Sequence, residues 1–444
     1  MSLSSVLRTA SKRAVRHAST SVSLAEVFPS VPSGHATPLS SKVAVSSTGK
    51  GLGLASISPA YTTTATLGVV FNTGSRFETA KDAGISLLAS KMAFRATQDR
   101  SDLAVFREIE AIGGSVTSSA NRESVTWSIT VAPEHVADAA AILAESLFSP
   151  RHADWDINTQ KEKVAVDYEL FQSNAIDLLA QGVHAAAFYD NRTLGRSIFA
   201  LDNLSKLNSK SLQAFYEQNV TAKNLVLVGR GLDHSTLNDV ANHYFSSIEV
   251  GQANVATPSV YVGGEHRTAA SSAHAYVAVG FSTGGALQGK DILTAHVLEH
   301  LLTQRSGRNS TGFTSIYSDA ALVGVSGVAK GAEASALTFD LLKNIQSVAS
   351  QAVSPAELEA AKKASGLGYI SWVESKDLAL SQLARAAKNQ TVVSESDIFQ
   401  GLNAVTAADV QSLAQKLVAN KKPILASVGA INDVPRYDDL LKKL

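Results

Sequence analysis

The sequence predicts an α+β protein built from two tandem homologous domains, each a mostly antiparallel sheet covered by helices. Strands mixed with runs of helices, rather than strict alternation of the two, favour this class. An internal repeat indicates the duplication, because Phe71–Ser75 (FNTGS) recurs as Phe281–Gly285 (FSTGG), at an offset of 281 − 71 = 210 residues. Lys81-Asp82 recurs as Lys290-Asp291 at an offset of 290 − 81 = 209. A duplicated domain with a single deletion leaves this pattern.

The first domain is expected over residues 21–245. Apolar or alternating runs predict strands at Lys42–Thr48, Leu52–Ser58, Ala65–Phe71, Ser115–Ala120, Val125–Val131 and Leu225–Val228. Helical spacing predicts helices at Ala83–Phe94, Asp102–Ile112, Pro133–Phe148, Asp154–Phe171 and Ala175–Phe188, then one from Leu212 and one through Phe245. Ser101 is suited to cap the second of these helices, and Gly113-Gly114 to end it.

Residues 246–272 are expected to form a linker, because they are rich in Ser, Thr, Ala and Gly. The second domain follows over residues 273–444. Its predicted strands are Tyr276–Phe281, Leu322–Val328 and Ile424–Val428, and its predicted helices are Asp291–Thr303, Glu333–Ala349, Pro355–Trp372, Ala407–Leu417 and a short final one.

Composition narrows the classes of function. Of the 444 residues, 45% are hydrophobic and 18% are charged, which is typical of a folded chain with a large core. The chain has no cysteine, which excludes disulfides, thiolate nucleophiles and thiolate ligation of zinc or iron–sulfur clusters. No apolar run approaches the roughly 20 residues of a spanning helix. Any membrane association is therefore expected only through partners.

Residues 1–20 are predicted to be a mitochondrial presequence. They carry Arg8, Lys12, Arg13 and Arg16, several serines and no acidic residue, and Glu26 is the first acidic residue of the chain. An amphipathic, Arg- and Ser-rich, acid-poor N-terminus is typical of mitochondrial targeting. Without these four residues, 39 − 4 = 35 basic residues face 39 acidic ones, a charge of about −4. This charge predicts no nucleic-acid partner.

The segment Gly84–Thr97 resembles the zinc-binding helix of the pitrilysin-type processing peptidases, whose pattern is H-x-x-E-H. The positions that should carry His, Glu and His hold Leu87, Ser90 and Lys91. Leucine has no lone pair to offer, serine is a poor base, and a lysine ammonium repels a cation. The family's third ligand lies about 77 residues further on. Counted from Lys91, that position is Tyr168, and only its neighbour Glu169 is acidic.

The second repeat contains a literal H-x-x-E-H formed by His296, Glu299 and His300, at the positions equivalent to the three just described. Two histidines four residues apart share one face of a helix and could reach one metal ion, with the glutamate beside them as a base. A zinc site of this kind still needs a third protein ligand.

Two ways of counting along the chain place this third ligand at different residues. Direct counting reaches Asp377, with Glu374 nearby, whereas the 200-residue offset between the later helices reaches Gly368-Tyr369, which supplies no ligand. We prefer the repeat alignment because it follows the packing of the helices. We therefore expect no catalytic residue, no metal ligand and no cofactor in this chain.

Three polar segments that could be taken for binding sites are interpreted as ordinary surface structure. Arg76–Glu78 and Arg122-Glu123 are expected to be solvated turns with local ion pairs of little energetic value. Gln304–Gly312 is expected to be a polar surface loop. In the processing peptidase, the noncatalytic subunit has a glycine-rich, substrate-touching loop in this region, whereas this chain has only Gly307 and Gly312 there.

Four further segments are similar to the core proteins of mitochondrial complex III, which belong to the same peptidase family. They are Gly182–Tyr189, Tyr216–Asn219, Leu227–Gly231 and Phe313–Asp319. The resemblance implies a processing-peptidase-like fold and a noncatalytic role in scaffolding and assembly of the ubiquinol to cytochrome c reductase. It also implies a place on the matrix side of the inner membrane, as a heterodimer with core protein 1 beside cytochrome b, the c-type cytochrome and the Rieske subunit.

Two alternatives stay open. The chain could be the noncatalytic, substrate-handling alpha subunit of the mitochondrial processing peptidase, or a zinc metallopeptidase that uses His296, Glu299 and His300. A free-standing mitochondrial dimer is a weaker third hypothesis.

Overall fold

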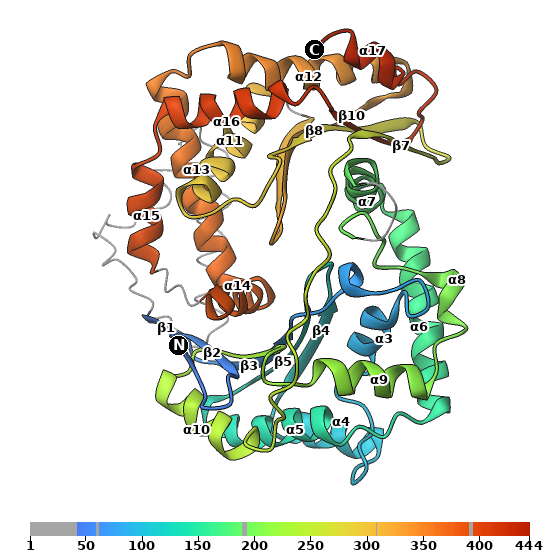
Figure 1. Cartoon of the computed structure of the whole chain (residues 1–444), viewed down its shortest axis with the longest axis vertical. Coiled ribbons are helices and arrows are strands. Elements are labelled where there is room, and N and C mark those ends of the chain that lie inside the picture. The colour runs from blue at the N-terminus through green and yellow to red at the C-terminus, as the bar shows by residue number, and fades with distance from the viewer. Residues whose placement is uncertain (1–41, 59–61, 189–192, 308, 390–393) are drawn as a thin grey trace, which may run out of the picture. The chain divides into compact units, whose positions relative to one another are not determined.

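The structure is a computed structural model that describes residues 42–58, 62–188, 193–307, 309–389 and 394–444. The predicted presequence lies outside these residues. Figure 1 shows two β-sheets with helices packed on them, which confirms the α+β class and the tandem arrangement. Within the described residues, none of the helices combines the length and the hydrophobicity needed to cross a membrane.

The first repeat contains a six-stranded sheet in the order β1-β2-β6-β3-β5-β4. Its strands are β1 (Lys42–Ser47), β2 (Gly53–Ser58), β3 (Ala65–Phe71), β4 (Ser115–Ala120), β5 (Val125–Val131) and β6 (Leu225–Arg230). Its helices are α3 (Ile85–Lys91), α4 (Asp102–Ala111), α5 (Val136–Phe148), α6 (Asp154–Ser173), α7 (Ala175–Ala187), α8 (Leu201–Leu204), α9 (Ser209–Asn219) and α10 (His234–Tyr244), with 3-10 turns at Ser75–Phe77 and Pro133–His135.

The second repeat contains a five-stranded sheet in the order β7-β11-β8-β10-β9. Its strands are β7 (Gly264–Ala269), β8 (His274–Ser282), β9 (Ser310–Ile316), β10 (Ala321–Lys330) and β11 (Ile424–Gly429). Its helices are α11 (Lys290–Arg305), α12 (Ala334–Ser350), α13 (Pro355–Glu374), α14 (Lys376–Asn389), α15 (Glu395–Asn403), α16 (Ala407–Ala419) and α17 (Tyr437–Leu441), with a 3-10 turn at Gly331–Glu333.

The two sheets share one topology. In each, a single pair is parallel, β2 with β6 in the first sheet and β7 with β11 in the second. The neighbouring pairs β3–β6 and β8–β11 are antiparallel, as are β3–β5 and β8–β10. By this correspondence, α3 of the first repeat is equivalent to α11 of the second, β4 is equivalent to β9, and α6 is equivalent to α13.

The expected linker needs a correction, because β7 lies inside residues 246–272. This strand, GEHRTA, pairs in parallel with β11, from Gly264 opposite Ile424 to Ala269 opposite Gly429. It is an edge strand with mostly polar side chains, so its sequence resembles a loop. Its partner lies about 160 residues further along the chain, where no local pattern can indicate the pairing.

Each repeat contributes one helix to the other repeat's sheet. Figure 1 shows α7 beside the strands of the second sheet and α14 beside β1 and β2 of the first. The apolar contacts of α7 with the second sheet join Leu179, Val183, Ala186 and Ala187 to Ala278, Leu322, Ile424, Ala426 and Val428. Those of α14 with the first sheet join Leu380, Leu383, Ala384 and Ala387 to Ala55, Ile57, Val70 and Val228.

Two glycines allow these helices to approach closely. A Cβ at Gly68 of β3 would lie 3.1 Å from Leu380 Cδ1 and 3.0 Å from Trp127 O. A Cβ at Gly182 of α7 would lie 3.0 Å from His266 Cδ2. Both contacts are tighter than ordinary van der Waals packing, so a larger residue at either position would push the exchanged helix away from its sheet.

Arg76 joins the two repeats, which corrects the expectation of a solvated turn at Arg76–Glu78. The residue is 3% exposed. Its guanidinium donates to the Glu123 carboxylate at 2.5 Å, to Asp319 Oδ1 at 2.8 Å, to Ser318 Oγ at 3.0 Å and to the Thr257 carbonyl at 2.8 Å. These partners come from the first repeat, the second repeat and the segment between them. A buried arginine whose two terminal nitrogens bind all of these groups fixes their positions.

The Arg122-Glu123 turn also takes part in this junction. Arg122 Nε donates to the Leu194 carbonyl at 2.9 Å, and its Nη2 donates to Gln181 Oε1 at 2.5 Å. The Glu123 carboxylate accepts from the Ser318 amide at 3.0 Å and from its hydroxyl at 2.6 Å. The expected solvated turn is therefore part of the contact between repeats.

A buried histidine gives the junction a dependence on pH. His184 Nδ1 donates to the Ala180 carbonyl at 2.7 Å, and its Nε2 accepts from the Tyr317 hydroxyl at 2.6 Å. Burial, with a smaller contribution from the charge of Arg122, lowers the pKa of His184 from 6.5 to about 3. The folded protein therefore keeps this imidazole neutral at pH values where the unfolded chain protonates it.

We expect the free energy of unfolding to fall as the pH drops below about 6.5 towards 3. In this pH range the imidazole is protonated in the unfolded state and neutral in the folded state. This one group therefore lowers the free energy of unfolding by about 1.4 kcal/mol for each pH unit. Urea unfolding at about pH 7 and about pH 5 measures the effect. The His184→Gln variant should show a shallower pH dependence, and an unchanged slope in this variant would contradict the assignment.

Candidate functional site

The short helix α3 carries the first candidate site. Its first turn is capped by Glu78, whose buried carboxylate accepts from the Gly84 amide at 2.8 Å and the Ser86 amide at 2.9 Å. Burial raises the pKa of Glu78, although these amide bonds and the charge of Arg196 act in the opposite direction. Gly84 adopts a φ of +87°, which favours glycine. The cap and the glycine fix where α3 begins, and therefore the direction in which its side chains point.

One face of α3 holds the three residues that replace His, Glu and His, and two of them, Leu87 and Ser90, are buried. Ser90 is buried and its hydroxyl donates to the Leu87 carbonyl at 2.7 Å. Lys91 Nζ forms an ion pair with Asp167 Oδ2 of α6 at 2.5 Å, and both side chains are about one-third exposed. The acidic residue facing α3 is therefore Asp167. The sequence count had reached Tyr168 and its neighbour Glu169, which follow Asp167 directly on α6.

These residues line a cavity of about 420 Å³. Its wall is formed by α3, by the edge strand β4 and by α6 with the segment that follows it. The lining residues are Leu87, Ser90, Lys91, Ser118, Ser119, Ala120, Asp167, Leu170, Phe171, Asn174, Asp177 and Phe199. Phe171 and Phe199 are packed with ring centroids 4.8 Å apart. The cavity is thus lined by polar side chains, among them the Lys91–Asp167 salt bridge, and by apolar ones such as Phe171 and Phe199.

This donor set does not fit a zinc ion. Zinc needs neutral nitrogen or anionic oxygen ligands, and of the three replaced positions one is aliphatic and one is cationic. The Ser90 hydroxyl is already committed to a backbone carbonyl. The ammonium of Lys91 compensates the charge of Asp167. The side chains at the three replaced positions therefore supply neither the metal ligands nor the general base that metal-assisted hydrolysis requires.

The second candidate site lies on α11. His296 Nδ1 lies 3.4 Å from Glu299 Oε2. A Cβ at Gly368 of α13 would lie 3.6 Å from His300 Nε2, so the imidazole faces the backbone of this glycine. Gly368, the position reached by the repeat alignment, is thus a neighbour of His300. Glu374 ends α13, and its charge acts on Arg230.

The two repeats differ in which polar residues they carry at equivalent positions. Helices α6 and α13 begin at Asp154 and Pro355, an offset of 355 − 154 = 201 residues, which places Asp167 in register with Gly368. The first repeat has an acidic residue on this helix and no His-Glu-His set on α3. The second repeat has the His-Glu-His set on α11 and a glycine at the position equivalent to the acidic residue. Among the described residues, no group of three or more His, Asp or Glu side chains converges as a metal ion would require.

The expected polar loop at 304–312 is largely ordered structure. Arg305 is the last residue of α11, and its guanidinium pairs with the Glu357 carboxylate at 3.2 Å through both Nε and Nη2. This bidentate bond lowers the pKa of Glu357 to about 2. Gly312 lies in β9, where a Cβ would clash with the Glu299 carbonyl at 2.3 Å. Arg308 lies outside the described residues.

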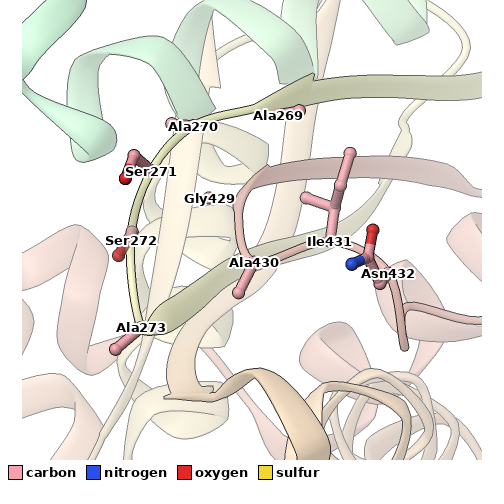
Figure 2. A pocket seen from close by; sticks show the side chains of 9 residues that line it. All are labelled: Ala269, Ala270, Ser271, Ser272, Ala273, Gly429, Ala430, Ile431 and Asn432. Carbon is pink, nitrogen blue, oxygen red and sulfur yellow. The ribbon is translucent and has the colours of Figure 1, made fainter.

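A second hollow, of about 430 Å³, lies where β7 and β11 end (Figure 2). Its lining consists of Ala269, Ala270, Ser271, Ser272, Ala273, Gly429, Ala430, Ile431 and Asn432. These side chains are small or neutral, and none of them is ionisable at physiological pH. We assign no chemistry to this hollow.

The fold and the two sites define a class of protein: a tandem repeat of the zinc-peptidase type in which neither metal site is complete within the described residues. Residues 54–201 match the family model described as Insulinase (Peptidase family M16), and residues 206–365 match the Peptidase M16 inactive domain. The chain belongs to peptidase family M16.

Its relatives divide into two groups. The chain is 29% identical to the mitochondrial-processing peptidase subunit alpha of Solanum tuberosum, over 86% of this chain and 81% of that protein. It is 26% identical to the cytochrome b-c1 complex subunit 2 of Rattus norvegicus, over 86% of this chain and 88% of that protein. It is also 30% identical to the ubiquinol-cytochrome-c reductase complex core protein I of Euglena gracilis, over 54% of this chain and 49% of that protein.

A triple substitution tests whether the first site has kept its geometry. Leu87→His, Ser90→Glu and Lys91→His together should install a zinc site, with Asp167 as the third ligand. We expect about one tightly held zinc per chain in this variant after dialysis, measured by elemental analysis, and none in the parent protein. Adding Asp167→Asn should abolish zinc retention. A folded triple variant that retains no zinc would contradict the placement of Asp167.

Proposed function

We propose that this protein is a noncatalytic subunit of a mitochondrial assembly, and specifically core subunit 2 of respiratory complex III. In this role it would scaffold the ubiquinol to cytochrome c reductase and would not cleave peptides. The observation that carries the proposal is the Lys91–Asp167 ion pair, because Lys91 stands at one of the three positions where the family's zinc motif has His, Glu and His. A cation supplied by the protein itself keeps the local charge balance of the site and removes its hydrolytic chemistry.

The architecture supports a scaffolding role. The two repeats exchange helices α7 and α14, and the buried arginine at position 76 ties them to the segment between them. An exchanged arrangement of this kind holds both sheets rigidly, which suits a subunit whose work is to present fixed surfaces. Several relatives are named as subunits of the cytochrome b-c1 complex.

The proposed partners follow from the same assignment. Core protein 1 would be the heterodimer partner, and cytochrome b, the c-type cytochrome and the Rieske subunit would be neighbours in the complex. We place the protein on the matrix side of the inner membrane and interpret residues 1–20 as its presequence, with peptidase-like domains over 21–245 and 273–444. Membrane association would run through the partners.

A second candidate function is the alpha subunit of the mitochondrial processing peptidase. The specific observation in its favour is the 29% identity to the potato alpha subunit over most of both chains. Against it, two residues of the segment expected to handle substrate have structural roles: Arg305 is bound by Glu357, and Gly312 is required by the close approach of β9 to α11. Only a few residues remain between the helix and the strand.

Depletion of the protein in its own organism separates the two candidates. A core subunit should be required for the level of assembled complex III, so spectroscopically measured cytochromes b and c₁ should fall together while presequences are still removed. Accumulation of uncleaved precursors alongside normal levels of these cytochromes would instead favour the processing-peptidase role and would contradict the proposal.

A further inference from the structure

Helix α11 presents two imidazoles that no part of the proposed function uses. His296 and His300 are separated by four residues, so both point from the same face of the helix. The His296 side chain is 44% exposed and that of His300 is half-buried. Imidazole nitrogens at this spacing can reach a single ion of a borderline transition metal.

The contact between His296 and Glu299 leaves one nitrogen of His296 available. The Glu299 carboxylate can only accept, so the Nδ1 atom of His296, 3.4 Å away, carries the proton and donates. The lone pair is then on Nε2, which points away from the carboxylate. A carboxylate that binds the far nitrogen of a histidine is the usual arrangement behind a metal ligand, because it fixes the tautomer and makes the imidazole more basic.

The position of Gly368 leaves the second imidazole open. Gly368 is exposed, and even a Cβ there would lie as far as 3.6 Å from His300 Nε2. The missing side chain at this position leaves space beside the imidazole for an ion, and the spacing of four residues places the two rings next to each other on α11.

We propose that α11 binds one divalent ion of the Zn²⁺, Ni²⁺ and Cu²⁺ class through Nε2 of His296 and Nε2 of His300, with Glu299 orienting the first ligand and water completing the coordination. Because Gly368 stands where the first repeat has Asp167, the site has two protein ligands and holds its ion weakly and exchangeably. It is a binding site and not a hydrolytic one, and it does not depend on the function proposed above.

The test uses the full chain purified without a histidine tag. Titration with Cu²⁺, followed by calorimetry, should show saturable binding, and electron paramagnetic resonance should show nitrogen ligation. His296→Asn and His300→Asn should each weaken the affinity at least about tenfold, and Glu299→Gln should do so to a smaller extent. The matched control is His135→Asn, another exposed histidine beside a carboxylate, Asp138, which lies 3.2 Å from its Nδ1. Affinity that is unchanged by both α11 substitutions, or lost equally in the control, would overturn the proposal.

A gain of affinity gives a second and independent test. Gly368→Asp introduces a carboxylate next to His300 Nε2, at the position where the first repeat has Asp167, and no backbone lies within contact distance of the new Cβ. A third ligand should tighten binding of Zn²⁺ by about tenfold or more, and adding His300→Asn should remove the gain. A Gly368→Asp protein with the parent's affinity would show that the ion does not lie between these helices.

Discussion

Replacing Arg76 with Met should lower the free energy of unfolding by about 3 kcal/mol, because it leaves two carboxylates without their shared cation. Arg76 is buried, whereas Glu123 and Asp319 keep 25% and 28% of their side chains exposed. Water can therefore solvate part of the released charge, which places the loss at the low end of the range for buried pairs. Urea unfolding followed by circular dichroism measures it.

A matched variant separates this effect from the general loss of an arginine. Arg95 pairs with Asp102 at 3.3 Å, and this pair is 30% and 47% exposed. Arg95→Met should cost less than about 1 kcal/mol, since exposed pairs contribute little. If Arg76→Met is no more destabilising than Arg95→Met, then Arg76 does not hold the repeats together.

The two halves of the chain should fail to fold when each is expressed alone. A fragment of residues 42–262 lacks α14, so the face of the first sheet around Ile57, Val70 and Val228 would be exposed to water. A fragment of residues 263–444 lacks α7 and exposes the equivalent face of the second sheet. Each large apolar side chain that loses its cover costs roughly 1.5–3 kcal/mol, a sum that marginal domain stability cannot absorb.

Co-expression is the control for this experiment. The two fragments together should assemble into a complex that unfolds in one transition, because each supplies the helix that the other needs. Circular dichroism and size-exclusion chromatography report the outcome. A single fragment that is monomeric and unfolds cooperatively on its own would show that the exchange of α7 and α14 is not required for folding.

The sequence alone was sufficient to predict those features that depend on a local pattern of residues. The bounds of β3, β4 and β5 agree with the predicted ones, since each strand is a short alternating or apolar run between turn residues. Ser101 caps α4 as expected, accepting from the Ala104 amide at 3.3 Å. The replacement of His, Glu and His on α3 was also visible, because it depends only on which residue types occupy three positions of an internal repeat.

What the sequence missed is non-local. Strands β7 and β9 are edge strands of mostly polar residues, and their partners lie elsewhere in the chain. The sequence around Arg76 predicts a surface residue, because its partner Asp319 comes from the other repeat and no local pattern indicates the pairing. The pairing of Asp167 with Lys91 was not predicted either, because a count along the sequence does not resolve which residue of a helix faces its neighbour.

The most direct measurement of the central claim is native fractionation of detergent-solubilised mitochondria, followed by identification of the proteins that migrate with this chain. A core subunit of complex III should migrate with cytochrome b, the c-type cytochrome and core protein 1, in equal amounts. Migration as a separate heterodimer that cleaves presequences, with none of the cytochromes present, would contradict the account.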